Sequence, residues 1–188
     1  MKLDDLLEQI PSYAKDLRLN ITAVFRQTEL NALQLWGTAV ACALAARNAE
    51  LTRTILSEAT PHLTPEALEA AKAASAIMGM NNIYYRFQHL SGSEKYKTMP
   101  ARLRMNVIRS HGVSQVDFEL WCIAISAING CGACVAAHER VVLEKGLTEE
   151  AILAAIRIAS VIHGLAAVLD AEAAVPSSAE PLVAPAST

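Results

Sequence analysis

The stretch Asn129–His138 reads NGCGACVAAH and lies between two apolar segments with helical spacing. Asn129-Gly130 predicts the end of the first helix, over residues 115–128, because both residue types tolerate the backbone conformation that stops a helix. The second helix is predicted to begin near Cys131 and to end at Lys145-Gly146, a basic last turn followed by a glycine cap. The stretch therefore predicts two helices folded back on each other, with a cysteine pair at the start of the second.

Capping residues predict the other helix starts. Ser114 opens the 115–128 helix with the spacing of a capping box. Thr64-Pro65 combines an N-cap hydroxyl with a proline at the first helical position, and this helix is predicted to end at Gly79. Thr148 caps a last helix that is predicted to extend to about residue 169.

Composition favours helices throughout the chain. The 188 residues are 53% hydrophobic but only 5% aromatic, and alanine is abundant, which is typical of tightly packed helices rather than a β-sandwich. No segment reads as a strand, and residues 80–113 are predicted to form shorter helices and turns. The predicted fold class is all-α. A net charge of -3 argues against nucleic acid as a partner.

An internal repeat relates the two halves of the chain. The matching pairs, separated by 85, 84 and 85 residues, are Leu35-Trp36 with Leu120-Trp121, Leu63-Thr64 with Leu147-Thr148, and ASAIMG (74–79) with ASVIHG (159–164). The pattern predicts one domain over residues 1–170, made of related helical halves at about 28–80 and 114–169. Residues 171–188, rich in proline, serine and alanine, are predicted to form a flexible tail.

The repeat also indicates where the chemistry lies. At a separation of 85 residues, Cys131 aligns with Ala46, Cys134 with Ala49, His138 with Arg53 and Glu119 with Gln34. The first half keeps the apolar framework and lacks the reactive side chains. We therefore expect the reaction to be confined to the second half.

The spacing of the cysteines favours redox chemistry. Cys131 and Cys134 lie three residues apart at a helix start, so they face the same side with Cα atoms about 5 Å apart, within disulfide range. His138 lies one turn after Cys134 on the same face, and the free N–H groups of the first helical turn favour a thiolate. Glu119, on the preceding helix, is expected to orient His138. This is the arrangement of a nucleophile, a base and an orienting carboxylate.

These residues carry a resemblance to a known family. Glu119-Leu120-Trp121 and the run SAINGCGACVAAHE (126–139) resemble the alkyl hydroperoxide reductase AhpD family, within the carboxymuconolactone decarboxylase-like superfamily. The likeness extends to MPARLRMN (99–106) and SYAKDLRLN (12–20). The resemblance implies an all-α, commonly trimeric protein with no bound cofactor.

The resemblance also implies an activity and residue roles. The family reduces organic hydroperoxides and passes electrons from dihydrolipoyl groups, on the lipoyl-bearing subunit of a 2-oxoacid dehydrogenase complex, to the peroxiredoxin AhpC. By this likeness Cys134 is the peroxidatic cysteine that becomes a sulfenic acid, and Cys131 is the resolving cysteine and proton donor. His138 is the base, and Glu119 belongs to the proton relay. One position departs from the family pattern, because Ala133 stands where well-known members carry a histidine.

Other interpretations remain at this point. Zinc would need four ligands, and only His138, with Glu119 as a further candidate, is available beside the cysteines. A purely structural disulfide, a cofactor-free decarboxylase and a non-catalytic oligomeric binding protein are the alternatives. Cys42 and Cys122 are expected to be core residues. His163 is expected in the core or in an interface. His62, His89 and His111 are expected at the surface. No signal peptide or membrane span is recognised, so a soluble cytoplasmic protein is expected.

Overall fold

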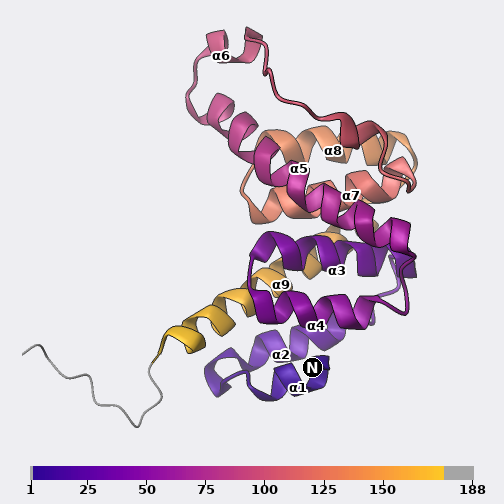
Figure 1. The fold of residues 1–188 in the computed structure, drawn as a ribbon, viewed down its shortest axis with the longest axis vertical. Helices are drawn as coiled ribbons and strands as arrows, with labels where there is room; N and C mark the ends of the chain where they lie inside the picture. Colours follow the sequence, from indigo (N-terminus) through magenta and orange to yellow (C-terminus); the bar gives the residue numbers. More distant parts are fainter. Residues whose placement is uncertain (1, 176–188) are drawn as a thin grey trace, which may run out of the picture.

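Helices make up all the regular structure of residues 2–175, the part of the chain that the computed structural model describes (Figure 1). The elements are α1 (Leu3–Glu8), η1 (Ser12–Ala14), α2 (Lys15–Val24), α3 (Ala32–Ala46), α4 (Ala49–Ala59), α5 (Pro65–Leu90), α6 (Glu94–Thr98), η2 (Asn106–Arg109), α7 (Gln115–Ile128), α8 (Gly132–Glu144) and α9 (Glu149–Ala174). No strand occurs within these residues, and the all-α prediction is confirmed.

The two halves share one pattern of helix starts. In α3, α4 and α5, and again in α7, α8 and α9, the N-cap side chain accepts a hydrogen bond from the backbone N–H three residues later. The paired N-caps are Asn31 with Ser114, Asn48 with Cys131, and Thr64 with Thr148, separated by 83, 83 and 84 residues. Each cap satisfies a backbone donor that the first helical turn leaves free. The predicted pair of related helical halves is thus confirmed.

This equivalence corrects the alignment of the cysteine helix. The 85-residue separation placed Cys131 opposite Ala46, whereas the N-caps place it opposite Asn48. Alanine-rich helices match in more than one register, so the caps locate the equivalence better than the apolar residues do. In the second half the sulfur of Cys131 therefore stands where the first half has the carboxamide of Asn48.

The core is built around α3 and α7, the equivalent first helices of the two halves. They pack against each other, and both also contact α5 and α9 (Figure 1). Residues Asp117–Ser126 of α7 are all buried. The α3–α7 contact is close because Gly37 has no side chain: a Cβ there would lie 2.1 Å from Cζ2 of Trp121. Removal of this apolar surface from water stabilises the central pair.

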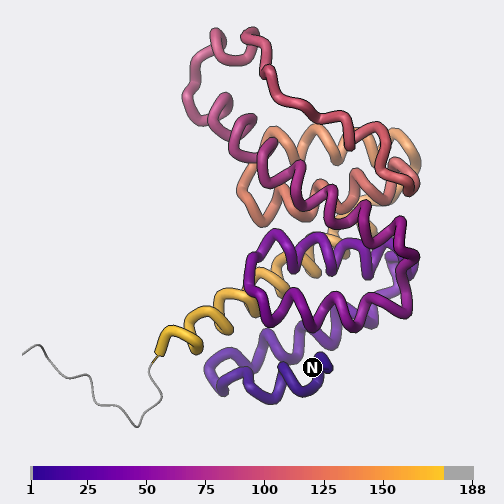
Figure 2. Tube along the Cα trace, in the orientation of Figure 1, coloured from indigo at the N-terminus to yellow at the C-terminus, as the bar shows by residue number. Residues whose placement is uncertain are grey.

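The remaining helices cover this centre. Helix α1 packs on α4 and α2 on α9, while α8 packs against α7 and α5. Figure 2 shows the N-terminal helices at one end of the molecule and the α6 segment at the other. The cysteine helix α8 therefore lies against α7 and α5 with one face, on which Cys134 and Val142 are buried, and its other face is exposed.

Two predicted helix ends are wrong. Helix α5 continues through Gly79 to Leu90, and α9 continues past residue 169 to Ala174. An interior glycine costs about 1 kcal/mol relative to alanine, which the packing of α5 against α3, α7 and α8 offsets. Short helices occur in the 80–113 region only after residue 90. The predicted tail begins inside α9, and its residues 176–188 lie outside the described part of the chain.

Helix α9 is long and apolar enough, by length and composition, to cross a membrane. The sequence analysis did not recognise this candidate span. However, 56% of its most apolar window is buried within the fold, where α9 contacts α2, α3 and α7. These contacts make α9 a core helix of the described domain.

Candidate functional site

The cysteine pair lies at the start of α8, directly after a tight turn. Gly130 adopts a φ of 67°, in the left-handed region that glycine enters without steric cost. The N–H of Cys131 then donates to the carbonyl of Ser126 at 3.0 Å, which returns the chain onto α7. Cys131 and Cys134 are joined by a disulfide, with Cα atoms 5.3 Å apart. The local sequence thus places both sulfurs together at a helix N-terminus.

Glu119 and His138 meet beside this pair. Oε2 of the Glu119 carboxylate, on α7, pairs with Nδ1 of the imidazole, on α8. The Glu119 side chain is 6% exposed and that of His138 is 14% exposed, so water competes little for the contact. Gln115 makes a long, 3.5 Å contact from Nε2 to the other carboxylate oxygen. Because Nδ1 is engaged, Nε2 is the ring nitrogen left for chemistry in the adjacent cavity.

A cavity of about 260 Å³ lies beside Cys134 and His138. Its lining comes from α5 (Asn81, Tyr85), the η2 region (Met105, Ile108) and α8 (Ala133, Cys134, Ala137, His138). Most of these side chains are apolar, and none is a lysine or arginine. Cys134 and His138 therefore face a common apolar space, whereas Cys131 is fully buried and does not line it.

A buried polar network fixes the turn from behind. Nδ2 of Asn82 donates to Oγ of Ser126 at 2.9 Å, and Nδ2 of Asn129 donates to Oδ1 of Asn82 at 2.9 Å. Arg86 donates to the carbonyl oxygen of Asn129. The network thus ties α5 to the end of α7 and to the residues just before Cys131.

The sequence analysis missed these α5 residues, because it ended the helix at Gly79. One signal was present: Asn81-Asn82 are two poor helix formers that interrupt an otherwise apolar helical run.

The other cysteines and histidines lie elsewhere. Cys42 and Cys122 are free and completely buried, and burial raises the pKa of both thiols. His62, His89 and His163 are exposed, so His163 is not in the core, one of its two expected places, and its place in an interface stays a prediction. His111, expected at the surface, is half-buried and stacks on Phe118 with ring centroids 4.0 Å apart. Burial lowers the pKa of His111.

Two further features bear on the alternatives. Within residues 2–175, no group of three or more His, Cys, Asp and Glu side chains is arranged to hold a metal ion.

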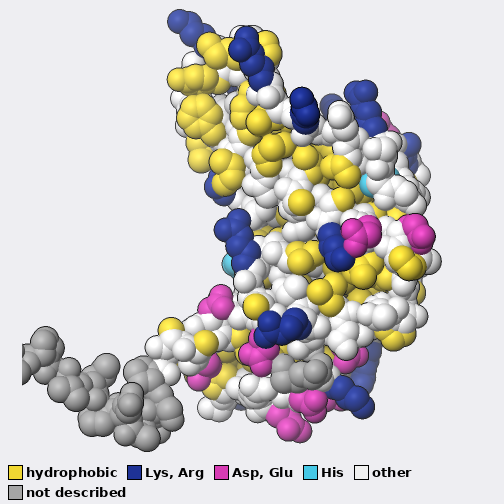
Figure 3. All heavy atoms as spheres, in the orientation of Figure 1, with side chains coloured by type: hydrophobic (Ala, Val, Ile, Leu, Met, Phe, Trp, Pro, Cys, Tyr) yellow, Lys and Arg dark blue, Asp and Glu magenta, His cyan; other side chains and the backbone are white. Residues whose placement is uncertain are grey.

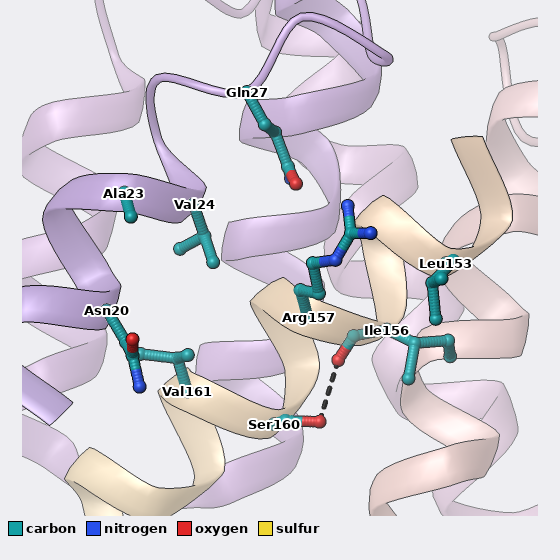
Figure 4. A pocket seen from close by; sticks show the side chains of 9 residues that line it. All are labelled: Asn20, Ala23, Val24, Gln27, Leu153, Ile156, Arg157, Ser160 and Val161. Carbon is teal, nitrogen blue, oxygen red and sulfur yellow. Dashed lines mark hydrogen bonds between the residues drawn. The ribbon is translucent and has the colours of Figure 1, made fainter. Parts of the chain in front are cut away.

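A larger hollow of about 510 Å³ lies between α2 and α9, where Figure 4 shows Gln27 and Arg157 beside apolar side chains. Neither cysteines nor histidines line this hollow, so it offers nothing for thiol chemistry.

Comparison with known proteins identifies relatives along almost the whole chain. The carboxymuconolactone decarboxylase family model matches residues 94–176, which include all four candidate residues. Three relatives are named alkyl hydroperoxide reductase AhpD. The protein from Solibacter usitatus is 64% identical over 92% of this chain and 98% of its own. Those from Acidobacterium capsulatum and Brucella canis are 60% and 51% identical, over 92% and 91% of this chain and 94% and 98% of their own.

Proposed function

Because the chain belongs to the alkyl hydroperoxide reductase AhpD family, we propose that it reduces organic hydroperoxides with the Cys131–Cys134 pair. One observation carries this proposal: the pair lies beside the buried Glu119–His138 contact and opens, through Cys134, onto an apolar cavity. The arrangement provides a nucleophile, a base and room for an alkyl group. Enzyme function, expected from the sequence, agrees with the names of the relatives.

The reaction can be written from the reduced pair. His138, oriented by Glu119, takes the proton of the Cys134 thiol, and the thiolate attacks the terminal oxygen of the hydroperoxide. An S–O bond forms, the O–O bond breaks, and the departing alkoxide takes a proton from the Cys131 thiol. The Cys131 thiolate then attacks the sulfenic acid at Cys134, the disulfide forms, and the released hydroxide takes the proton from His138. Two thiols and one hydroperoxide give one disulfide, one alcohol and one water.

The structure supports Cys134 as the peroxidatic residue. The dipole argument alone favours Cys131, which is the N-cap itself, but that effect contributes only about 0.3–1 kcal/mol. Cys134 lines the cavity together with His138, whereas Cys131 is buried behind it. A hydroperoxide in the cavity reaches Cys134 first.

Single-cysteine variants test this assignment. Cys131→Ser should still react with cumene hydroperoxide and retain a sulfenic acid at Cys134, which mass spectrometry detects after dimedone trapping. Cys134→Ser should lose the reaction. If Cys134→Ser keeps the single-turnover rate and Cys131→Ser loses it, the roles are reversed; if the wild type forms no disulfide with hydroperoxide, the proposed activity is wrong.

The electron donor and acceptor are part of the proposal. We propose that dihydrolipoyl groups on a 2-oxoacid dehydrogenase subunit reduce the disulfide, that electrons can pass on to the peroxiredoxin AhpC, and that the cycle runs in the cytoplasm. A compartment that keeps thiols reduced suits a pair that must be re-reduced each turnover. Dihydrolipoamide should reduce the Cys131–Cys134 bond faster than glutathione at equal thiol concentration. Equal rates would argue against a dedicated dithiol donor.

The decarboxylase alternative has one observation in its favour, the name of the matching family model. Decarboxylation of an anionic acid would need a group that holds the carboxylate, and no lysine or arginine lines the cavity by the cysteines. Such a reaction would also leave the cysteine pair without a role. We therefore prefer the peroxidase, and a Cys134→Ser variant that retains a decarboxylase activity would reverse this preference.

We also propose that the protein is a homotrimer. Hydrophobic side chains gather over the end of α5 and over α6 (Figure 3), and the exposed large ones there are Ile83, Phe87, Leu90, Tyr96 and Met99. An exposed apolar cluster of this kind is typical of a subunit contact. Light scattering should give three times the 20.2 kDa of one chain. Phe87→Glu should lower this mass. Leu19→Glu, at an exposed site on α2, is the control and should leave the mass unchanged. If the wild type has the mass of one chain, it is not a trimer.

A further inference from the structure

The carboxamide oxygen of Asn81, a residue that lines the cysteine cavity, is buried without a hydrogen-bond partner. The residue is 4% exposed, it lines the cavity with Cys134 and His138, and its Oδ1 has no hydrogen-bond partner. A buried amide oxygen without a hydrogen bond costs about 1–3 kcal/mol. Native folds rarely leave such a group unpaired, and an ordered water or a bound ligand can supply the missing hydrogen bond.

The neighbouring residue shows that this is not a general property of α5. Asn82 is also buried, but its amide binds Ser126 and Asn129, both at 2.9 Å. Two adjacent asparagines thus have different surroundings: Asn82 belongs to the structural network, and Asn81 is one of the residues that line the cavity. The chain offers an internal control for any role assigned to Asn81.

We propose that the Asn81 carboxamide binds the hydroperoxide group of the substrate beside Cys134, an inference that rests on the proposed peroxidase function. Its oxygen accepts the hydrogen bond of the substrate O–H and so holds the terminal oxygen toward the sulfur. The S–O bond that forms and the O–O bond that breaks are those of the reaction above; Asn81 neither gains nor loses a proton. The residue binds and orients the substrate.

The rest of the cavity makes this role specific. Ala133 leaves the turn between the cysteines without a polar side chain at the cavity, and the Tyr85 hydroxyl faces Sδ of Met105 at 3.8 Å. Besides Cys134, the described lining residues with a polar side chain are Asn81, His138 and Tyr85, and the Tyr85 hydroxyl already donates to the Met105 sulfur. Tyr85, Met105 and Ile108 provide the apolar wall for its carbon chain.

Two reagents separate substrate binding from thiolate formation. Reduced wild type and Asn81→Leu are reacted with cumene hydroperoxide, which needs the orienting amide, and with iodoacetamide, which alkylates thiolates and needs no orienting amide. Peptide mapping follows the alkylation at Cys134. We expect Asn81→Leu to lower the second-order rate with hydroperoxide about tenfold, the loss of roughly one hydrogen bond, and to change alkylation less than about twofold. Its melting temperature should stay the same or rise, because a buried unpaired polar group has been removed.

Asn82→Leu is the matched control. It should lower the melting temperature and slow both reagents alike, because it breaks the network behind the turn. If Asn81→Leu does not fold, Asn81→Ala must show the same separation of the two rates. An Asn81 variant that reacts with hydroperoxide at the wild-type rate, or that loses both reactions equally, overturns the inference; a wild type that does not react at all overturns the peroxidase itself.

Discussion

Glu119 and His138 form a contact between α7 and α8 from which water is almost entirely excluded. The pair holds the imidazole by Nδ1, so Nε2 is available on the side of the cavity that Cys134 also lines. Both side chains are largely buried and paired with each other, which restricts their rotation. The contact thus fixes the orientation of the imidazole that we propose as the base.

Replacement of either partner should slow the oxidation of Cys134. Glu119→Gln preserves the shape of the side chain but removes the negative charge that stabilises a protonated imidazole, and His138→Gln removes the base. We expect a rate on the order of 10²-fold lower with cumene hydroperoxide, the usual scale of general acid–base catalysis. Stopped-flow measurement of disulfide formation checks this. Glu139→Gln, an exposed site on α8, is the control; variants as fast as this control would remove the pair from the mechanism.

Cys42 and Cys122 should not react in the folded protein. Burial raises the pKa of both thiols, and the charge of Glu119 raises that of Cys122 further. Only the thiolate is alkylated. A pH of about 8 is below even the usual pKa of a thiol, so the raised pKa keeps Cys42 and Cys122 protonated there. Iodoacetamide should therefore add at most two groups to the reduced native protein and four in denaturant, by intact mass. A third addition to native protein would contradict the buried placement.

Ser126→Ala should destabilise the fold. The variant removes the acceptor of the 2.9 Å hydrogen bond from Asn82, whose amide is fully buried. We expect the free energy of unfolding in urea to fall by about 1–2 kcal/mol, the cost of an unpaired buried donor. Ser160→Ala is the control, because that exposed hydroxyl binds only its own helix, at the carbonyl of Ile156. Equal effects of the two variants would show that the network adds nothing to stability.

Two glycine-to-alanine variants should have opposite effects. At Gly37 a new Cβ would collide with the indole of Trp121, and we expect a loss of about 1–3 kcal/mol through overpacking. At Gly79 a Cβ would meet no atom within 4 Å, and alanine should stabilise the interior of α5 by about 0.5–1 kcal/mol. Thermal unfolding measures both changes. A destabilising Gly79→Ala would show that this face of α5 is covered in solution.

The sequence alone predicted the features that local chemistry controls. Ser114 and Thr148 each begin a helix where their hydroxyls predicted, because capping depends only on residues within one turn. The placement of Cys131 at a helix start followed from the adjacent turn, in which Gly130 adopts a positive φ. Glu119 and His138 were selected by their spacing to the cysteines, and the roles of all four residues remain proposals.

Only the tertiary structure decided what α5 contributes. The sequence placed a helix end at Gly79, but contacts with α3, α7 and α8 carry the helix through it, and the partners in those contacts lie far from Gly79 along the chain. That extension brings Asn81 to the cavity of Cys134 and Asn82 to Ser126, across more than forty residues of chain. The physical reason is that capping and periodicity act within a few residues, whereas burial, hydrogen-bond pairing and cavity shape depend on which helices pack together.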